Sequence, residues 1–361
     1  MHGGAEKVLV NLVNNLNQLK YDVTLFSVFD KGVNKQFLKD HVKYKSRFKN
    51  VFRGNSQLMK LFTPSFLYRF FIKDDYDLVI SFLEGPAARI ISGCKQDNCI
   101  KVAWIHTEMQ DKEVAKAGFR NFGEAKKVYE DFHSIVAVSK NVADAFNDMF
   151  GSAVPTTVLY NVNDTEDILE KAKEKNFNFD YSTLPNICST GKIIKVKGFD
   201  RLLHVHKMLL NEGLAHKVWV LGKGAEQKTL ELKVRKAGLS DSFSFLGFCE
   251  NPYEIMSKSD LYVCSSWREG FSTAVTEALI LGVPCVSTDV SGAGELLGTE
   301  NEYGIVTENS TDGLYRGLKQ LLEDNTKLQF YKEQSKKRGA HFSTSETVKK
   351  VELFIDSVLN E

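Results

Sequence analysis

Short apolar segments alternate with helix-like segments along almost the whole of this 361-residue chain. The run 260–265 is typical, because its centre from Leu261 to Cys264 is a continuous apolar stretch, as expected of a strand buried inside a parallel sheet. After a loop, Val275, Ala278 and Leu279 recur at helical spacing. This order of elements predicts doubly wound α/β domains with parallel sheets. Other strand-like runs are 22–28, 78–82, 101–106, 134–139, 157–161, 186–191, 217–222, 242–247 and 284–288.

The length predicts two domains, and a hydrophobic content of 43% is enough for two ordinary cores. The segment 176–185 is polar and aromatic without periodicity, so we expect the linker there. The first domain would then be 1–175 and the second 186–344.

The overall composition excludes several classes of protein. A net charge of +1 gives no global sign of nucleic-acid binding. The six cysteines are scattered without zinc-site spacing and are interpreted as reduced core residues. No run approaches the roughly 20 apolar residues of a membrane span, and the start lacks a signal-peptide layout. We therefore expect a cytoplasmic protein.

Two carboxylates stand eight positions apart where the run 260–265 passes through a loop into a helix. Ser272 or Thr273 can cap that helix, whose N-terminus favours a phosphate group. Gly270 would let the main chain approach such a group without a side chain intervening. Glu269 lies in the loop, at the mouth. Glu277 lies more than a turn into the helix, where a carboxylate can accept two hydrogen bonds from a vicinal diol such as ribose.

This segment, continued by 282–289 and 291–296, resembles glycosyltransferase family 4, a large group of retaining GT-B enzymes. Glu269 and Glu277 match the E-x7-E motif of that family, in a Glu-Gly-Phe and Glu-Ala-Leu-x-x-Gly-x-Pro context. The resemblance implies two Rossmann-like doubly wound domains facing a cleft, with the C-terminal segment 345–361 completing the first domain. Its implied donor-binding residues in this segment are Glu269, Gly270, Phe271, Ser272, Thr273 and Glu277.

The loop 191–200 resembles the Gly-Arg-x-x-x-x-Lys-Gly loop of the family. Lys197 matches its lysine, and Lys192 stands where arginine is usual. The alternative is that the lysines of this loop are simply solvated. The position after a strand, where open α/β sheets bind ligands, favours phosphate contact for Lys197 and leaves Lys192 evenly balanced. No Asp-x-Asp motif sits at a strand end, so we expect no metal ion.

Two further turns of the second half carry glycine. Gly222-Lys223-Gly224 is a weak dinucleotide fingerprint, because Gln227 sits at the last glycine position. It fits the Gly-x-Gly turn near the donor in the family. Gly247 and Phe248 match a loop whose backbone reads the nucleotide base, although a buried strand end is an equally good interpretation.

In the first half, Gly3 and Gly4 open a helix and could bring backbone N–H groups to a phosphate or an acceptor. A simple helix cap is the alternative. His106 ends a strand and resembles the histidine found near the donor sugar in the family. A purely structural role is the alternative for His106. The family places a β-strand before the His-Gly-Gly-Ala-Glu motif that begins this chain, so we expect an upstream strand to be missing.

From Lys43 to Lys73 the chain contains no acidic residue, while basic and aromatic side chains interleave. Such a composition suits an anionic membrane and a lipid-linked acceptor. The alternative is that the aromatics pack inside while the lysines are solvated. The expected location is thus cytoplasmic. Peripheral contact with the inner face of the cell membrane follows if the basic and aromatic segment binds lipid, and not if its aromatics pack inside.

The resemblance implies a retaining, metal-independent hexosyltransferase that uses no cofactor beyond its donor. The donor would be a UDP-hexose or UDP-N-acetylhexosamine, with a GDP-sugar second, and the acceptor a glycan or a lipid-linked glycan of a polysaccharide such as a capsule. Lys197, His106 and Glu269 would act on the donor, Glu269 as a ligand of sugar hydroxyls, with a covalent route left open. A non-catalytic GT-B partner and a GT-B sugar-nucleotide epimerase are the alternatives.

Overall fold

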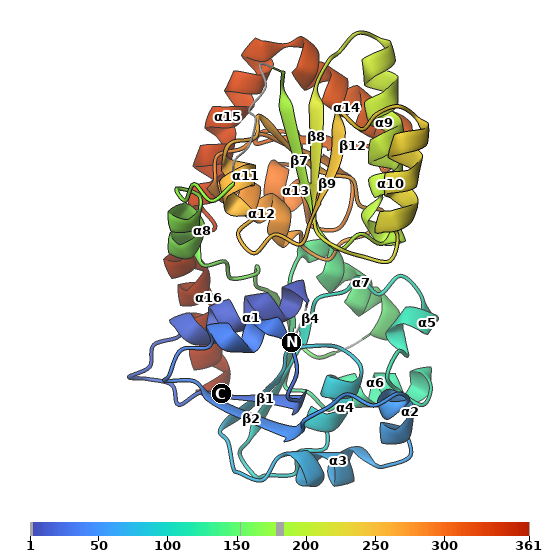
Figure 1. Ribbon diagram of the computed structural model, residues 1–361. Coiled ribbons are helices and arrows are strands. Elements are labelled where there is room, and N and C mark those ends of the chain that lie inside the picture. Colours follow the sequence, from blue (N-terminus) through green and yellow to red (C-terminus); the bar gives the residue numbers. More distant parts are fainter. Residues whose placement is uncertain (1–2, 152, 178–183, 361) are drawn as a thin grey trace. The chain divides into compact units, whose positions relative to one another are not determined.

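The computed structural model describes residues 3–151, 153–177 and 184–360, and the chain divides into two compact units (Figure 1). One unit runs to Val162 and resumes at Thr344, and the other is Asn163–Ser343. The expected linker 176–185 lies largely outside the described residues. The division falls earlier than that linker, because helix α8 (Thr165–Lys171) contacts helices of the second unit.

The sheet of the second unit is parallel, with the strand order β12-β11-β10-β7-β8-β9. Figure 1 shows α9, α10 and α14 on one face of this sheet and α12 and α15 on the other. Both faces are therefore covered, which is why strands such as β10 are buried at every position. The strands are β7 (Asn186–Thr190), β8 (Lys217–Leu221), β9 (Phe243–Gly247), β10 (Leu261–Cys264), β11 (Cys285–Thr288) and β12 (Ile305–Thr307).

The helices of this unit connect the strands in crossovers, as parallel pairing requires. The sequence analysis located every strand of this sheet except β12, a three-residue segment that is too short to give a periodic signal. After α8, the helices are η2 (Lys195–Lys197), α9 (Phe199–Asn211), α10 (Gln227–Lys236), α11 (Tyr253–Ser257), α12 (Thr273–Ile280), α13 (Ala293–Leu297), α14 (Thr311–Glu323) and α15 (Asn325–Ala340).

The described strands of the first unit form two parallel sheets, β1-β2 and β3-β4-β5-β6. The sequence analysis missed β2, whose alternating lysines and aromatics were interpreted only as a basic patch. The strands are β1 (Thr24–Phe29), β2 (Lys43–Phe48), β3 (Leu78–Ser81), β4 (Ile100–Ile105), β5 (Ser134–Ala137) and β6 (Thr156–Val158). The helices are α1 (Gly4–Asn15), η1 (Val33–Phe37), α2 (Asn55–Met59), α3 (Pro64–Phe71), α4 (Pro86–Ile91), α5 (Lys112–Ala115), α6 (Phe122–Glu130), α7 (Lys140–Phe150) and α16 (Thr344–Leu359).

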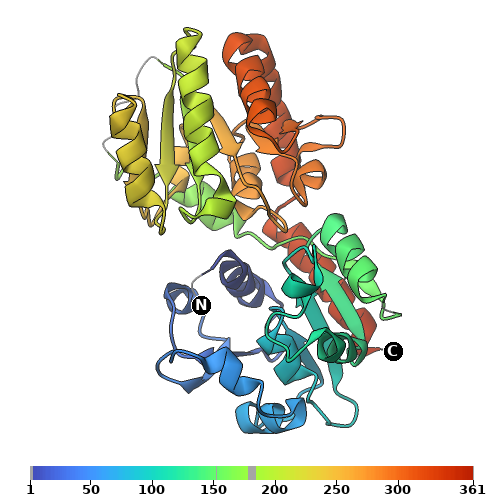
Figure 2. The same ribbon diagram turned by 90° about the vertical axis from the view of Figure 1, so that its right-hand side faces the viewer.

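The last helix, α16, belongs to the first unit although the second unit precedes it in the chain (Figure 2). Its side chains hold the loop that follows α1. The backbone N–H of Asn17 donates to Glu352 Oε1 at 2.8 Å, and the Tyr21 hydroxyl donates to Asp356 Oδ1 at 2.8 Å. Within the described parts of the chain, no helix is both long and apolar enough to cross a membrane.

Candidate active site

The strand order of the second unit reverses between β7 and β10. In open parallel sheets, ligands bind outside the carboxyl ends of the strands at such a reversal, because the two following loops diverge there. The loop after β7 contains Lys192 and Lys197, and the loop after β10 contains Glu269 and Gly270. Tertiary structure therefore brings together two motifs that are about 70 residues apart in sequence.

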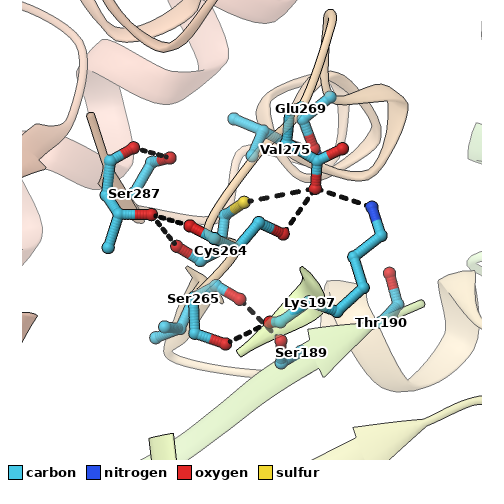
Figure 3. A network of polar contacts seen from close by, with 12 residues as sticks. Ser189, Thr190, Lys197, Cys264, Ser265, Glu269, Val275 and Ser287 are labelled. Atoms are coloured by element: carbon cyan, nitrogen blue, oxygen red, sulfur yellow. Dashed lines mark hydrogen bonds and ion pairs between the residues drawn. The ribbon is translucent and has the colours of Figure 1, made fainter. Parts of the chain in front are cut away.

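Three donors converge on the Glu269 carboxylate (Figure 3). Lys197 Nζ lies 2.6 Å from Glu269 Oε1, and Ser266 Oγ lies 2.5 Å from the same oxygen. The Cys264 thiol lies 3.9 Å away. A charged carboxylate with a cation and a hydroxyl donor is fixed in one orientation, because charge-assisted hydrogen bonds are the strong ones.

The ion pair of Lys197 with Glu269 is largely shielded from water, with 27% and 13% of the two side chains exposed. Burial by itself lowers the pKa of Lys197. The Glu269 carboxylate more than offsets this effect through its charge and its hydrogen bond, and the net result is a raised pKa. Lys197 thus remains a cation, with three N–H donors of which Glu269 uses one.

A buried arginine locks the two loops together. Arg201, on α9, donates from Nε to the carbonyl of Ser265 at 2.7 Å and from Nη2 to the carbonyl of Ser266. Its guanidinium stacks on the Trp267 ring, 3.8 Å from the ring centroid. Gly198 lies against the Ser265 carbonyl so closely that any side chain there would collide with it. The position of Glu269 is therefore set by packing around its loop as well as by Lys197.

Ser272 caps α12, with its hydroxyl accepting from the Val275 N–H at 3.4 Å, as predicted for Ser272 or Thr273. Phe271 is 5% exposed and packs toward Phe342, so its ring belongs to the core. Gly270 and Thr273, beside the helix start, are partly exposed. The start of α12 thus presents backbone and small side chains at the carboxyl edge of the sheet.

Glu277 lies in the second turn of α12 and is 6% exposed. The hydroxyl of Tyr253, on α11, donates to Glu277 Oε1 at 2.9 Å. Glu269 and Glu277 therefore have different environments: the first is paired with a cation, and the second receives a hydrogen bond from a neutral phenol.

The glycines of the turn after β8 allow it to lie directly on the loop after β7. A side chain at Gly222 would collide with the Gly191 carbonyl, and one at Gly224 with the Ile193 carbonyl. Gly222 also has a φ of 141°, which other residues rarely adopt. Lys192 lies in the same region and is exposed, and its contact with a phosphate remains a prediction.

The end of β9 completes this edge of the sheet. The Gly222 N–H donates to the Gly247 carbonyl at 2.7 Å, and Gly247 has a φ of 77°. Phe248, the next residue, is 63% exposed, which differs from the interpretation of this segment as a buried strand end. An exposed ring at a ligand-binding edge is compatible with contact to a nucleotide base, and that role remains a prediction.

In the first unit, Gly3 and Gly4 stand at the start of α1. The Gly3 N–H donates to Glu6 Oε2 at 3.0 Å, so the acidic side chain of the first turn lies at this helix terminus. Gly3 and Gly4 therefore have the helix-cap geometry, and their contact with a ligand remains a prediction.

His106 follows β4, and one of its two ring nitrogens has no hydrogen-bond partner. The ring N–H of His106 donates to the Phe82 carbonyl. The other ring nitrogen, Nε2, is inaccessible to water and has no hydrogen-bond partner in the described structure. Burial lowers the pKa of His106 to about 4, so the ring is neutral near pH 7. Glu84 fixes the loop by accepting from the His106 and Thr107 N–H groups, the second at 2.6 Å.

The sequence analysis missed four side chains that hold the predicted ones. Arg201 and Ser266 flank recognised motifs, so the only available signal was their proximity in sequence. Tyr253 and Glu84 lie in loops or short helices that carry no pattern. Among the residues described, no group of three or more His, Cys, Asp or Glu side chains could hold a metal ion.

Two family models cover most of the chain. The model described as "Glycosyltransferase Family 4" matches residues 2–167, and "Glycosyl transferases group 1" matches residues 170–338. The N-acetylgalactosamine-N,N'-diacetylbacillosaminyl-diphospho-undecaprenol 4-alpha-N-acetylgalactosaminyltransferase of Campylobacter jejuni is 31% identical over 56% of this chain and 54% of its own length. The chain thus matches about half of that relative. A Haemophilus influenzae protein named only as an uncharacterized glycosyltransferase is 25% identical over 90% of this chain and 88% of its own.

Solved structures agree on the fold. A crystal structure of Anabaena Alr3699/HepE in complex with UDP and glucose superposes with a TM-score of 0.78 and 19% identity, covering 98% of this chain and 96% of the other. A glycosyltransferase from Rickettsia africae superposes with a TM-score of 0.77 and 16% identity, over 99% and 95%. With the matched family models over both units, the chain belongs to glycosyltransferase family 4 and has the GT-B fold.

Proposed function

We propose that the protein is a retaining, metal-independent glycosyltransferase that moves a hexose or N-acetylhexosamine from a UDP-sugar to a glycan or lipid-linked acceptor. The observation that carries this proposal is the pairing of Lys197 with Glu269 beside the start of α12, at the strand-order reversal of the second sheet. The UDP complex of the Anabaena neighbour and the lipid-linked substrate in the name of the Campylobacter relative are consistent with it.

Each group has a defined task in this reaction. Lys197 and the N–H groups at the start of α12 offset the charge that grows on the departing diphosphate. Glu269 binds hydroxyls of the transferred sugar, because Lys197 and Ser266 fix its orientation. The contact of His106 with the donor sugar is a prediction from the family resemblance, and it requires that the Nε2 atom, which is shielded from water in this structure, become accessible to a sugar hydroxyl. The acceptor attacks the same face that the diphosphate leaves, and the departing phosphate takes the acceptor proton.

The test is incubation with a panel of UDP- and GDP-sugars, with and without lipid-linked acceptors. Nucleotide release together with a glycoside of retained anomeric configuration is the expected result. Release of free sugar nucleotide in a changed configuration would identify an epimerase instead. No turnover with any donor, together with stimulation of another transferase, would identify a non-catalytic partner. A glycosylated Glu269 trapped with a slow donor would replace same-face substitution by a covalent route.

A surface of the first unit supports a membrane-bound acceptor. The segment 43–73 divides into two parts. Tyr44 and Phe48, on β2, are half-buried, as the alternative of inward aromatics requires. The part from 51 to 66 instead exposes large apolar side chains, which we name the apolar patch: Val51, Phe52, Leu58, Leu61, Phe62 and Phe66.

The apolar patch is built on a fixed backbone. Arg89, itself 1% exposed, donates to the carbonyls of Met59 at 2.8 Å and Phe62 at 2.6 Å. Arg120 donates to the Lys60 carbonyl at 2.5 Å. Because these arginines satisfy the carbonyls after α2, Leu61 can remain 73% exposed in a defined position. With no acidic residue from 43 to 73, the patch and its basic rim match an anionic lipid surface.

Sedimentation with vesicles containing about a third anionic lipid tests this part of the proposal. We expect binding that weakens with salt and with Arg53→Glu plus Arg69→Glu, and that also falls with Leu61→Ser plus Phe62→Ser. Lys233→Glu, an exposed charge change on α10, is the matched control. Binding that is indifferent to salt and to the arginine changes would remove the membrane contact.

A further inference from the structure

The hydrogen bond between Tyr253 and Glu277 joins two buried side chains beside the candidate site. Tyr253 is 3% exposed and Glu277 is 6% exposed, and their oxygens lie 2.9 Å apart. A carboxylate at such a depth needs hydrogen-bond donors, because burying a charge without them is costly. Neither the E-x7-E motif nor any other sequence pattern pointed to Tyr253.

The fold holds Tyr253 firmly at the first residue of α11. Its N–H donates to Asn251 Oδ1 at 3.1 Å, and the following Ile255 and Met256 are almost completely buried. The helix α11 contacts both α8 and α12. Its preceding loop begins at Phe248, the exposed ring after β9. One short segment therefore runs from the residue predicted to meet the base to the residue that touches Glu277.

The direction of this hydrogen bond is fixed. Burial, with the nearby charge of Glu277, raises the pKa of Tyr253 well above 10, so the phenol is protonated and must donate. An ionised carboxylate has about four acceptor sites, so it can accept from Tyr253 and from both hydroxyls of a diol. The Tyr253 contact is with a neutral phenol, whereas the contact of Lys197 with Glu269 is with a cation.

We infer that Tyr253 is a positioning residue that orients the Glu277 carboxylate toward the ribose diol of the donor nucleotide, and so makes the site selective for ribonucleotides. The inference rests on the proposed function, because it applies only if the second unit binds a nucleotide donor. Tyr253 itself need not touch the ligand. Its loss should therefore affect only those parts of the nucleotide that Glu277 binds.

The test compares equilibrium binding of UDP and 2′,3′-dideoxy-UDP to the full chain by calorimetry. For the wild type we expect UDP to bind at least about 10-fold more tightly, as two hydrogen bonds to a charged acceptor allow. Tyr253→Phe should lower UDP affinity about 5-fold or more and leave dideoxy-UDP affinity unchanged. Glu277→Gln should also reduce the ratio of UDP affinity to dideoxy-UDP affinity. Combining Tyr253→Phe with Glu277→Gln should reduce this ratio little further than either single change.

Tyr262→Phe is the matched control. Tyr262 is also buried, and its hydroxyl lies 3.2 Å from Thr190 Oγ1 on β7 and accepts from the Thr190 N–H at 3.4 Å, so this change likewise removes the hydrogen bonds of a buried phenol from the second unit. In Tyr262→Phe the ratio of UDP affinity to dideoxy-UDP affinity should equal that of the wild type. Equal weakening of both nucleotides in Tyr253→Phe, or an unchanged ratio, would overturn the inference and leave the proposed function intact. A wild type that binds neither UDP nor GDP would overturn both.

Discussion

The loops around Glu269 in the second unit and the apolar patch of the first unit hold their functional groups in different ways. Around Glu269 the polar groups bind one another, and glycines allow backbones to lie in direct contact. The first unit instead carries a polar atom without a partner, Nε2 of His106, and an apolar patch whose side chains stay exposed although its rings contact other rings. A preorganised polar site needs many mutually specific residues, whereas a docking surface needs only composition on a fixed backbone.

Replacement of Glu269 by Gln should have the largest effect, because it removes the charge on which Lys197 and Ser266 converge. We expect kcat to fall about 100- to 1000-fold, the usual loss when one preorganised electrostatic group is removed. Steady-state kinetics with the preferred donor measure this. A variant within threefold of the wild-type kcat would show that the Glu269 cluster is only structural.

Lys197→Ala should lower kcat/KM about 10- to 100-fold, because a charge-assisted hydrogen bond is worth roughly 1.5–3 kcal/mol. Lys195→Ala is the control in the same loop, since Lys195 is exposed. It should remain within about twofold of the wild type. Equal effects of the two changes would mean that the loop acts through its general charge and that the ion pair has no special role.

His106→Phe tests whether the orphan acceptor of the first unit is used. The change keeps a ring against Phe82, whose centroid lies 4.8 Å from that of His106, and removes both Nε2 and the ring N–H that donates to the Phe82 carbonyl. A neutral hydrogen bond of roughly 1 kcal/mol predicts about a 5-fold lower kcat/KM. Because the pKa of His106 is lowered to about 4, the wild-type profile should show no titration of this group from pH 5 to 8. Unchanged turnover in the variant would make His106 a structural residue.

The smallest expected effect concerns stability in the second unit. His206 Nδ1 donates to His216 Nε2 at 2.8 Å, because His216 Nδ1 must itself donate to the Leu214 carbonyl. Burial, followed by the neighbouring His216, lowers the pKa of His206 to about 3, and burial also lowers the pKa of His216. Both rings are neutral when folded, so this stabilisation is complete above the unfolded pKa of about 6.5 and declines as pH falls below it.

Urea unfolding at pH 7 and pH 5 measures that decline, which should be roughly 2 kcal/mol for His206, with a contribution of the same sign from His216. His206→Gln should reduce the difference between the two pH values. His204→Gln, an exposed change on the same helix, should leave it unaltered. An identical pH dependence in the wild type and His206→Gln would exclude the histidine pair as its source.

Periodicity was enough to locate most strands of both units, because a strand covered on both faces must be a continuous apolar run. Periodicity failed at β2, a strand of a two-stranded sheet whose alternating lysines and aromatics were interpreted as a basic segment. It also failed at β12, which has only three residues. The prediction of Ser272 as a helix cap was confirmed, since a cap is a local property. The alternative interpretation of this segment as a buried strand end does not hold for Phe248, which is 63% exposed, because burial at a strand end depends on neighbouring loops.

The sequence by itself determined the family, the α/β class and the two glutamates eight positions apart. Their spacing indicated a donor site, because strand, loop, cap and helix are all encoded by neighbouring residues. Only the tertiary structure decided that Lys197 pairs with Glu269 and that Tyr253 donates to Glu277. Those partners come from separate strand–helix crossovers, and they meet because the strand order reverses between β7 and β10 and because α11 packs on α12.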